Sequence, residues 1–289
     1  MFTILSVVSG MFLTNDITVL TLVPLYLKIA KKYKLPQIFP VTLIGMGANI
    51  GAAFTPWGNP HNLFVVDHFN VDFLTFFSWS AHLLLFGLVL LAFLILAVKK
   101  RPIPVESTQD LRISWKPTLV TTILSFFFFF GVFKVVPIWL PALAVIGWAL
   151  ILNPRIMTHV DYSLLLTFTC FFIFISDIQQ IQPIVLLVSK MMFSEHSVYL
   201  TSILTSQVIS NVPSTILVGK FTNFAKALFY GSNIGGFGSV VGSMANMLVF
   251  KTFSENGTVK RSRFFGLFSL LEFGVLAILT FVGWFFVKN

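Results

Sequence analysis

Residues 47–66 read GANIGAAFTPWGNPHNLFVV, and residues 231–250 read GSNIGGFGSVVGSMANMLVF. Aligned without a gap, the two stretches are identical at seven of 20 positions, and Thr55 also meets Ser239. Most of the identities are glycine or asparagine, so shared hydrophobicity does not explain them. The alignment therefore predicts an internal repeat.

The same order of segments surrounds both copies. Upstream of each lies an apolar segment that is broken by a polar tip, at residues 14–15 in one case and 210–211 in the other. Downstream come a loop and one unbroken apolar segment. Backbone groups freed at such breaks cannot face lipid, so they must be buried in protein or line a polar cavity. Paired interrupted segments in two halves of a chain point to a transporter binding site.

The composition indicates a protein of the lipid bilayer. The 289 residues are 56% hydrophobic and 10% charged, with a mean hydropathy of +0.91, whereas soluble domains carry about 25% charged residues. Several unbroken apolar windows approach the length of about 20 residues that spans a bilayer. They are residues 80–98, 117–133, 135–152, 162–189 and 264–287. We expect an all-α integral membrane protein that crosses the cell membrane several times.

The net charge of +9 indicates orientation rather than nucleic-acid binding, because the basic residues sit in short loops between apolar segments. Loops 28–36, 99–116 and 251–263 carry lysine and arginine, whereas loop 67–79 carries two aspartates and no basic residue. With the basic loops in the cytoplasm, the first broken helix runs outward and the second runs inward. We expect inverted-topology repeats, each with a re-entrant hairpin and a broken helix, and a C-terminus outside.

These patterns divide the chain into a first repeat at 1–98, a cytoplasmic linker at 99–116 and a second, inverted repeat at 117–289. Apolar helices within residues 117–196 precede the second hairpin, but the first hairpin starts at Met1. We therefore expect the first repeat to lack its opening helices, as in a fragment, a misplaced start or a decayed gene.

Two segments resemble the ion transporter superfamily, which includes divalent anion–sodium symporters, citrate transporter-like permeases, arsenite-efflux subunits and some sodium–proton antiporters. Residues 49–62 look like its loop after the first hairpin, and residues 206–213 look like its second hairpin tip. The resemblance covers nearly the whole chain. It implies a secondary transporter, and a homodimer, since dimers are common among such proteins.

The hairpin tips depart from one branch of that superfamily. Sodium–dicarboxylate transporters carry a Ser-Asn-Thr triplet at each tip, whereas here residues 14–16 read Thr-Asn-Asp and residues 210–212 read Ser-Asn-Val. Both tips differ at the third position, which weakens the case for dicarboxylate specificity and for the sodium coupling of that branch.

A hairpin tip that meets a broken helix brings helix N-termini and free carbonyls together. Helix N-termini favour anions, and carbonyl and amide oxygens suit a hard cation such as Na⁺. The predicted substrate-binding residues are Thr14, Asn15, Thr55, Asn59, Ser210, Asn211, Ser239 and Ser243. The predicted Na⁺ ligands are Asn15, Gly51 and Gly58 in one half and Ser206, Asn211 and Gly235 in the other.

Structural alternatives exist for these residues. Asn15 and Asn211 can cap helix ends or form interhelical hydrogen bonds. The polar residues near the breaks, including Asn62 and Asn246, can serve packing, with residues 47–51 and 238–242 as close GxxxG contacts.

Ionisable side chains add candidates for coupling. Asp16, at the first tip, is either a proton carrier or cation ligand, or the N-cap of the helix that starts at Ile17. Asp177, in an apolar helix with three glutamines, should face inward and either contact substrate or order the break before Pro183. For Glu272 we expect a partner on a neighbouring helix. His61 is either protonatable or structural.

The sequence thus predicts a secondary active transporter of a small anion, a carboxylate or oxyanion, coupled to Na⁺ or H⁺. The alternatives are a cation–proton antiporter or arsenite efflux permease, and an inactive or partner-dependent membrane fragment. The chain has no Walker loop, zinc-ligand spacing or nucleophile–base pair, so we expect neither an enzyme nor a cofactor, other than Na⁺ as coupling ion. The expected partners are a small ion and the lipid bilayer.

Overall fold

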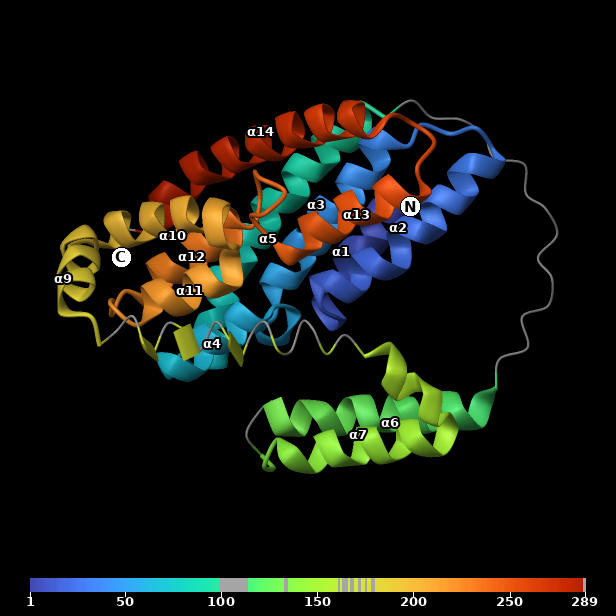
Figure 1. Cartoon of the computed structure of the whole chain (residues 1–289), viewed down its shortest axis with the longest axis horizontal. Coiled ribbons are helices and arrows are strands. Elements are labelled where there is room, and N and C mark those ends of the chain that lie inside the picture. The colour runs from blue at the N-terminus through green and yellow to red at the C-terminus, as the bar shows by residue number, and fades with distance from the viewer. Residues whose placement is uncertain are drawn as a thin grey trace. The chain divides into compact units, whose positions relative to one another are not determined.

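The computed structural model describes residues 1–98, 114–132, 135–160 and 180–287, together with isolated positions between 161 and 179. Within these ranges every regular element is a helix (Figure 1). The chain divides into two units, one formed by residues 1–102 and 170–289 and the other by residues 103–169.

The larger unit contains helices from both ends of the chain. They are α1 Phe2–Phe12, α2 Asn15–Lys32, α3 Ile38–Phe54, the 3-10 turn η1 Pro56–Gly58, α4 Pro60–His68, α5 Phe73–Leu96, α9 Gln182–Met191, α10 Glu195–Ile209, α11 Asn211–Gly219, α12 Ala225–Gly235, α13 Met244–Asn256 and α14 Arg261–Val287.

The smaller unit is a helical hairpin. Helix α6, Trp115–Val132, packs against α7, Trp139–Leu152, and a 3-10 turn, η2 Pro154–His159, follows. The indole Nε1 of Trp148 donates a hydrogen bond to Thr121 Oγ1 at 3.2 Å, which ties the two helices together. The two helices match the predicted apolar segments 117–133 and 135–152.

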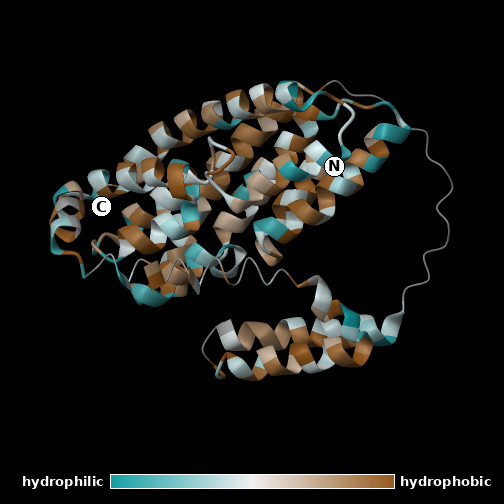
Figure 2. Ribbon diagram, in the orientation of Figure 1, coloured by the Kyte–Doolittle hydropathy of each residue, from teal (hydrophilic) through white to brown (hydrophobic). Residues whose placement is uncertain are grey.

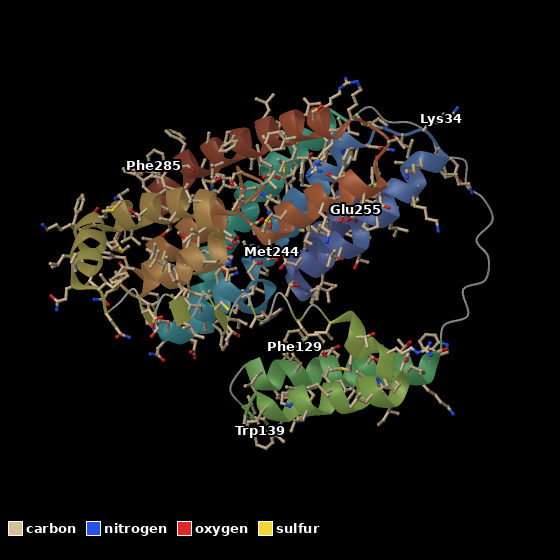
Figure 3. All side chains as sticks on the ribbon, viewed as in Figure 1. Lys34, Phe129, Trp139, Met244, Glu255 and Phe285 are labelled. Carbon is tan, nitrogen blue, oxygen red and sulfur yellow. The ribbon has the colours of Figure 1, made fainter. Side chains whose placement is uncertain are left out.

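Two helices of the larger unit, α5 and α14, are long and apolar enough to cross a bilayer, and α1, α3, α6 and α7 are shorter apolar helices. Figure 2 shows hydrophobic residues along most of the helical ribbon. Large apolar side chains on α14 stand outside the packed core, including Leu270, Phe281 and Phe285, and Figure 3 shows Phe285 pointing away from the helix. Such an outer surface suits lipid rather than water.

The two halves of the larger unit make matching contacts. Helix α1 packs on α3 as α10 packs on α12, and α5 packs on α3 as α14 packs on α12. Across the halves, α2 packs on α13 and α11 packs on α4. Because each half contributes a helix to the other half's packing, the halves are interlocked, as Figure 1 shows for α2 beside α13.

Glycines permit the closest of these contacts. A Cβ on Gly51 of α3 would collide with the carbonyl oxygen of Val7 in α1. At the matching position in α12, a Cβ on Gly235 would lie 2.7 Å from Ser206 Oγ of α10. Small residues let helix backbones approach in this way. The predicted packing role of Gly47 and Gly51 is therefore confirmed, and both lie inside α3.

Several predicted boundaries differ from the structure. From the sequence, residues 37–66 are expected to be broken by Gly51 and by residues 55–62. Gly51 does not break a helix, because α3 continues through it to Phe54 and the break falls at residues 55–59. The basic loops 28–36 and 251–263 are shorter than expected, since α2 runs to Lys32 and α13 to Asn256. Most of loop 99–116 and of segment 162–179 lies outside the described residues.

Candidate functional site

The first hairpin tip lies between α1 and α2. Thr14 is the N-cap of α2, and its Oγ1 accepts a hydrogen bond from the backbone N–H of Ile17 at 3.4 Å. Asn15 begins the helix and is buried, and its Nδ2 donates to Oδ1 of Asn49 in α3 at 2.9 Å. The predicted alternative for Asn15, an interhelical hydrogen bond, is therefore present.

Asp16 lies in the first turn of α2 rather than at its N-cap, so the capping role considered for it is wrong. Its backbone N–H donates to Oδ1 of Asn15 at 3.0 Å. Its Oδ1 is buried and has no hydrogen-bond partner among the residues that the structure describes. A carboxylate oxygen left in this state is available to a proton or a cation.

The second hairpin tip is strained. Ser210 joins α10 to α11 with φ 71° and ψ 154°, a region that is almost restricted to glycine and costs about 1–3 kcal/mol for other residues. Thr14, at the matching place in the first tip, has φ −78° and carries no such strain. The next residue, Asn211, is buried and its N–H donates to the carbonyl of Gly242 at 2.9 Å, which joins this tip to the second break.

Each break in a helix is closed by one asparagine side chain. Nδ2 of Asn62 donates to the carbonyl oxygens of Ala52 and Thr55 at 3.2 and 3.1 Å. In the second half, Nδ2 of Asn246 donates to Gly236 and Ser239 at 3.0 and 3.1 Å. The gapless alignment pairs these residues one for one. The breaks therefore have the same internal structure.

The two breaks are also bonded to each other. Nδ2 of Asn49 donates to Oδ1 of Asn246 at 3.2 Å, and Nδ2 of Asn233 donates to Oδ1 of Asn62 at 2.9 Å. Asn49 also lies 3.4 Å from the hydroxyl of Ser243, the N-cap of α13. We call these four asparagines the amide lattice. Its members are all buried.

The hydroxyls of the breaks anchor the hairpins. Thr55 Oγ1 donates to the carbonyl of Met11 at 3.0 Å, and Ser239 Oγ donates to the carbonyl of Gln207 at 3.1 Å. Thr55 is buried and Ser239 is partly buried. Thus each predicted tip and its predicted break meet in the same half.

The remaining predicted residues are placed as follows. Asn59 is buried at the N-cap position of α4, without a side-chain capping bond. His61 Nε2 lies 3.1 Å from Asn233 Oδ1, which supports the structural role. Asp177 is exposed and stands outside the cluster, and Gln179 lies outside the described residues. Both oxygens of Glu272 are buried without a hydrogen-bond partner within the described chain, so the expected partner on a neighbouring helix is not found.

The proposed Na⁺ ligands differ between the halves. Gly51 and Gly58 are buried, and no side chain in the described part of the chain donates to the carbonyl of Gly51. The carbonyl of Gly235, in contrast, accepts a hydrogen bond from Gln207 Nε2 at 2.8 Å. Ser206 Oγ donates to its own helix, at Ser202.

Sequence reasoning did not assign roles to Gln207, Asn49 or Asn233. The two asparagines were visible as identities of the repeat, but the alignment gives no bonding partner. Gln207 stands in α10, a helix that also carries serines and threonines, four residues before Asn211, and Met11 holds the matching place in the first half. Comparison of the two hairpins, rather than of the two breaks, would have revealed it.

Comparisons with known proteins identify relatives of this chain. The chain is 32% identical over 248 residues to the inner membrane protein YbiR of Escherichia coli, a match that covers 83% of this chain and 65% of that protein. It is 32% identical over 256 residues to an uncharacterised transporter of Methanocaldococcus jannaschii, covering 87% of this chain and 69% of the relative.

The chain thus spans about two thirds of the length of these relatives. The family model described as citrate transporter matches residues 1–222, which include the first hairpin, the first break and the second hairpin tip. The resemblance predicted from the motifs is confirmed at this level: the chain is a helical membrane protein that belongs to the CitMHS citrate transporter family.

Proposed function

We propose that this chain is a secondary active transporter that carries a small anion, a carboxylate or oxyanion, coupled to Na⁺ or H⁺. The observation that supports it best is the start of four helices at the tips and breaks. Helices α2, α4, α11 and α13 begin at Asn15, Pro60, Asn211 and Met244, and Figure 3 marks Met244 at the start of α13. Helix N-termini carry partial positive charge and bind anions without a basic side chain.

The charge of the site fits an anion and a cation together. The tips and breaks contain no lysine or arginine, so an anion would depend on helix N-termini, amides and a coupling cation for its stabilisation. Side chains and carbonyls that suit a hard cation are present in the first half, at Thr14, Asn15 and Gly51. A small anion of low charge is the substrate class that this combination favours.

Matching contacts of the two halves support inverted topology as part of this proposal. We place the basic end of α2, the basic segment 260–263 that follows α13, and loop 99–116 in the cytoplasm, and the C-terminus outside. In this arrangement the tips enter from opposite sides and meet near the middle of the membrane. Such a site suits alternating access.

A cation–proton antiporter or arsenite efflux permease is the second candidate, and the unpartnered Oδ1 of Asp16 favours it. Asp16→Asn separates the two. It removes the ionisable group and keeps the shape, so proton-coupled cation exchange should collapse, whereas anion uptake should persist or improve.

The experiment is transport by the purified chain in liposomes, with labelled citrate, a dicarboxylate and arsenite, under an imposed Na⁺ or proton gradient. Gradient-driven uptake of one of these anions supports the proposal. Exchange of a cation for protons that is lost in Asp16→Asn supports the second candidate. A folded chain that transports nothing under any gradient would overturn both and favour a partner-dependent membrane protein.

A further inference from the structure

One side chain breaks the correspondence between the two halves at the hairpins. The tips align with Asn15 on Asn211, and the same gapless alignment places Met11 on Gln207. The structure supports this pairing, because the carbonyl of Met11 accepts a hydrogen bond from Thr55 and the carbonyl of Gln207 accepts one from Ser239. The two carbonyls therefore make the same contact, whereas the two side chains differ.

The amide of Gln207 occupies a group of carbonyl oxygens. Nε2 lies 2.8 Å from the carbonyl oxygen of Gly235, 3.0 Å from that of Phe237 and 3.3 Å from that of Ile203. Oε1 accepts the N–H of Ser239 at 2.8 Å, which fixes the amide so that its nitrogen faces the carbonyls. Several carbonyl oxygens around one point are the surroundings that a hard cation takes in proteins.

The first half aligns without the amide, and its helix α3 continues through the aligned positions to Phe54, whereas α12 ends at Gly235. The matching carbonyls belong to Val7, Gly51 and Ala53. The thioether of Met11 has no hydrogen to donate, and within the described ranges no side chain donates to the carbonyls of Gly51 or Ala53. The carbonyl oxygens of Gly51 and Ala53 therefore have no side-chain donor that would compete with a cation.

A second difference between the halves points the same way. Asp16 follows Asn15 at the first tip and keeps a buried oxygen without a partner, whereas Val212 follows Asn211 at the second tip. Negative charge thus accompanies the half with open carbonyls. The second tip has no acidic residue, and the buried carboxyl group of the second half, Glu272, lies on α14 instead.

We propose that the amide of Gln207 is a permanent internal substitute for a coupling cation, so that the second half binds no ion and the chain takes Na⁺ in its first half alone. Gln207 then determines the number of ions that bind. That this ion drives transport rests on the proposed function. The number of Na⁺ ions bound per chain can be measured without transport. The sequence predicted two Na⁺ sites, and this inference keeps only the site that includes Asn15 and Gly51.

The test compares Na⁺ binding by the wild-type chain with binding by two variants, Gln207→Met and Met11→Gln. Each variant places in one half of the chain the residue that the other half has at the matching position. Binding is counted with labelled Na⁺ on the purified chain, and the melting temperature is compared in NaCl and choline chloride. A ligand that binds only the folded state raises this temperature. We expect one Na⁺ per chain in the wild type, two in Gln207→Met and none in Met11→Gln.

Gln207→Glu is a second variant that keeps the inference testable if Gln207→Met does not fold. Its carboxylate places negative charge among the carbonyls, so the variant should be destabilised in choline chloride and recover selectively in NaCl. Gln37→Glu is the matched control, because Gln37 is buried and its Oε1 also accepts a backbone N–H, that of Thr258 at 2.8 Å. It should be destabilised without selective recovery in NaCl.

Two Na⁺ or none in the wild type, or an unchanged count in Met11→Gln, would overturn the inference. Anion transport driven by protons, with no Na⁺ bound, would overturn it and leave the proposed function standing. One Na⁺ bound in the first half, without transport under any gradient, would support the inference and count against the proposed function.

Discussion

Asn62 and Asn246 form the same pair of hydrogen bonds, each spanning from the first turn of a short helix back to two carbonyls of the preceding break. Both side chains are fully buried. A side-chain amide thus replaces the backbone N–H groups that the interrupted helix lacks. In a membrane this replacement matters, because no water is present to satisfy the freed carbonyls.

Asn62→Ala and Asn246→Ala should each lower the free energy of unfolding by about 1–3 kcal/mol, since both leave buried carbonyls without a donor. The measurement is reversible unfolding in mixed micelles. The control is Asn256→Ala, which removes one partly buried bond to Thr252 near the end of α13. If this control costs as much as the other two, the breaks have no special dependence on their asparagines.

The hydrogen bonds between the two halves should appear as a coupling free energy in double-mutant cycles. We expect the double mutant Asn49→Ala with Asn246→Ala to be less destabilised than the sum of its single mutants, by about 0.6–1.7 kcal/mol, the range found for hydrogen bonds between membrane helices. Asn49→Ala combined with Asn256→Ala should be additive within about 0.5 kcal/mol. Additivity in both pairs would mean that the hydrogen bond between Asn49 and Asn246 contributes no coupling energy.

Gly51→Ala and Gly235→Ala should destabilise the chain by about 1–3 kcal/mol, because each new methyl group forces a hairpin away from its broken helix. Gly274→Ala is the control, since nothing lies within 4 Å of its added Cβ in α14. It should be neutral or stabilising by up to about 1 kcal/mol, through helix propensity. Melting temperatures of the three variants in one detergent test this order, and equal loss in all three would refute it.

Ser210→Gly should raise the melting temperature, because glycine adopts φ 71° and ψ 154° without the strain that serine carries there, about 1–3 kcal/mol. Thr14→Gly should lower it, since Thr14 is unstrained and its hydroxyl caps α2. A loss of stability in Ser210→Gly would mean that the serine hydroxyl contributes more than the strain costs. Transport measured beside stability would indicate whether the strain serves function.

The places of the breaks could be predicted because their residues disfavour continuous helix. Proline and asparagine at 55–62 and glycine and serine at 235–243 gave the first and second breaks, and the repeat alignment paired them correctly. Gly51 was mistaken for part of a break. A glycine that admits a neighbouring backbone and a glycine that ends a helix look alike in sequence, and only the contact with Val7 distinguishes them.

The bonding within the site could not be read from the sequence in the same way. Asn15 was predicted to bind an ion or a neighbouring helix, and its partner, Asn49, is fixed by the packing of α1 and α2 on α3. Capping of α2 was considered for Asn15 and Asp16, but the helix starts at Asn15, two residues before Ile17, and Thr14 is its N-cap. Gln207 was one polar residue among several in α10 and became informative only beside Met11.

The interlocking of the halves has a consequence for synthesis on the ribosome. Asn49 is made 197 residues before Asn246, which at about 5–20 residues per second is an interval of about 10–40 s. During that time the nascent first half carries buried amides whose final partners do not yet exist, and its α4 lacks the surface of α11. The first half must therefore wait in the membrane in a provisional form, and the final packing can begin only when the second broken helix has left the ribosome.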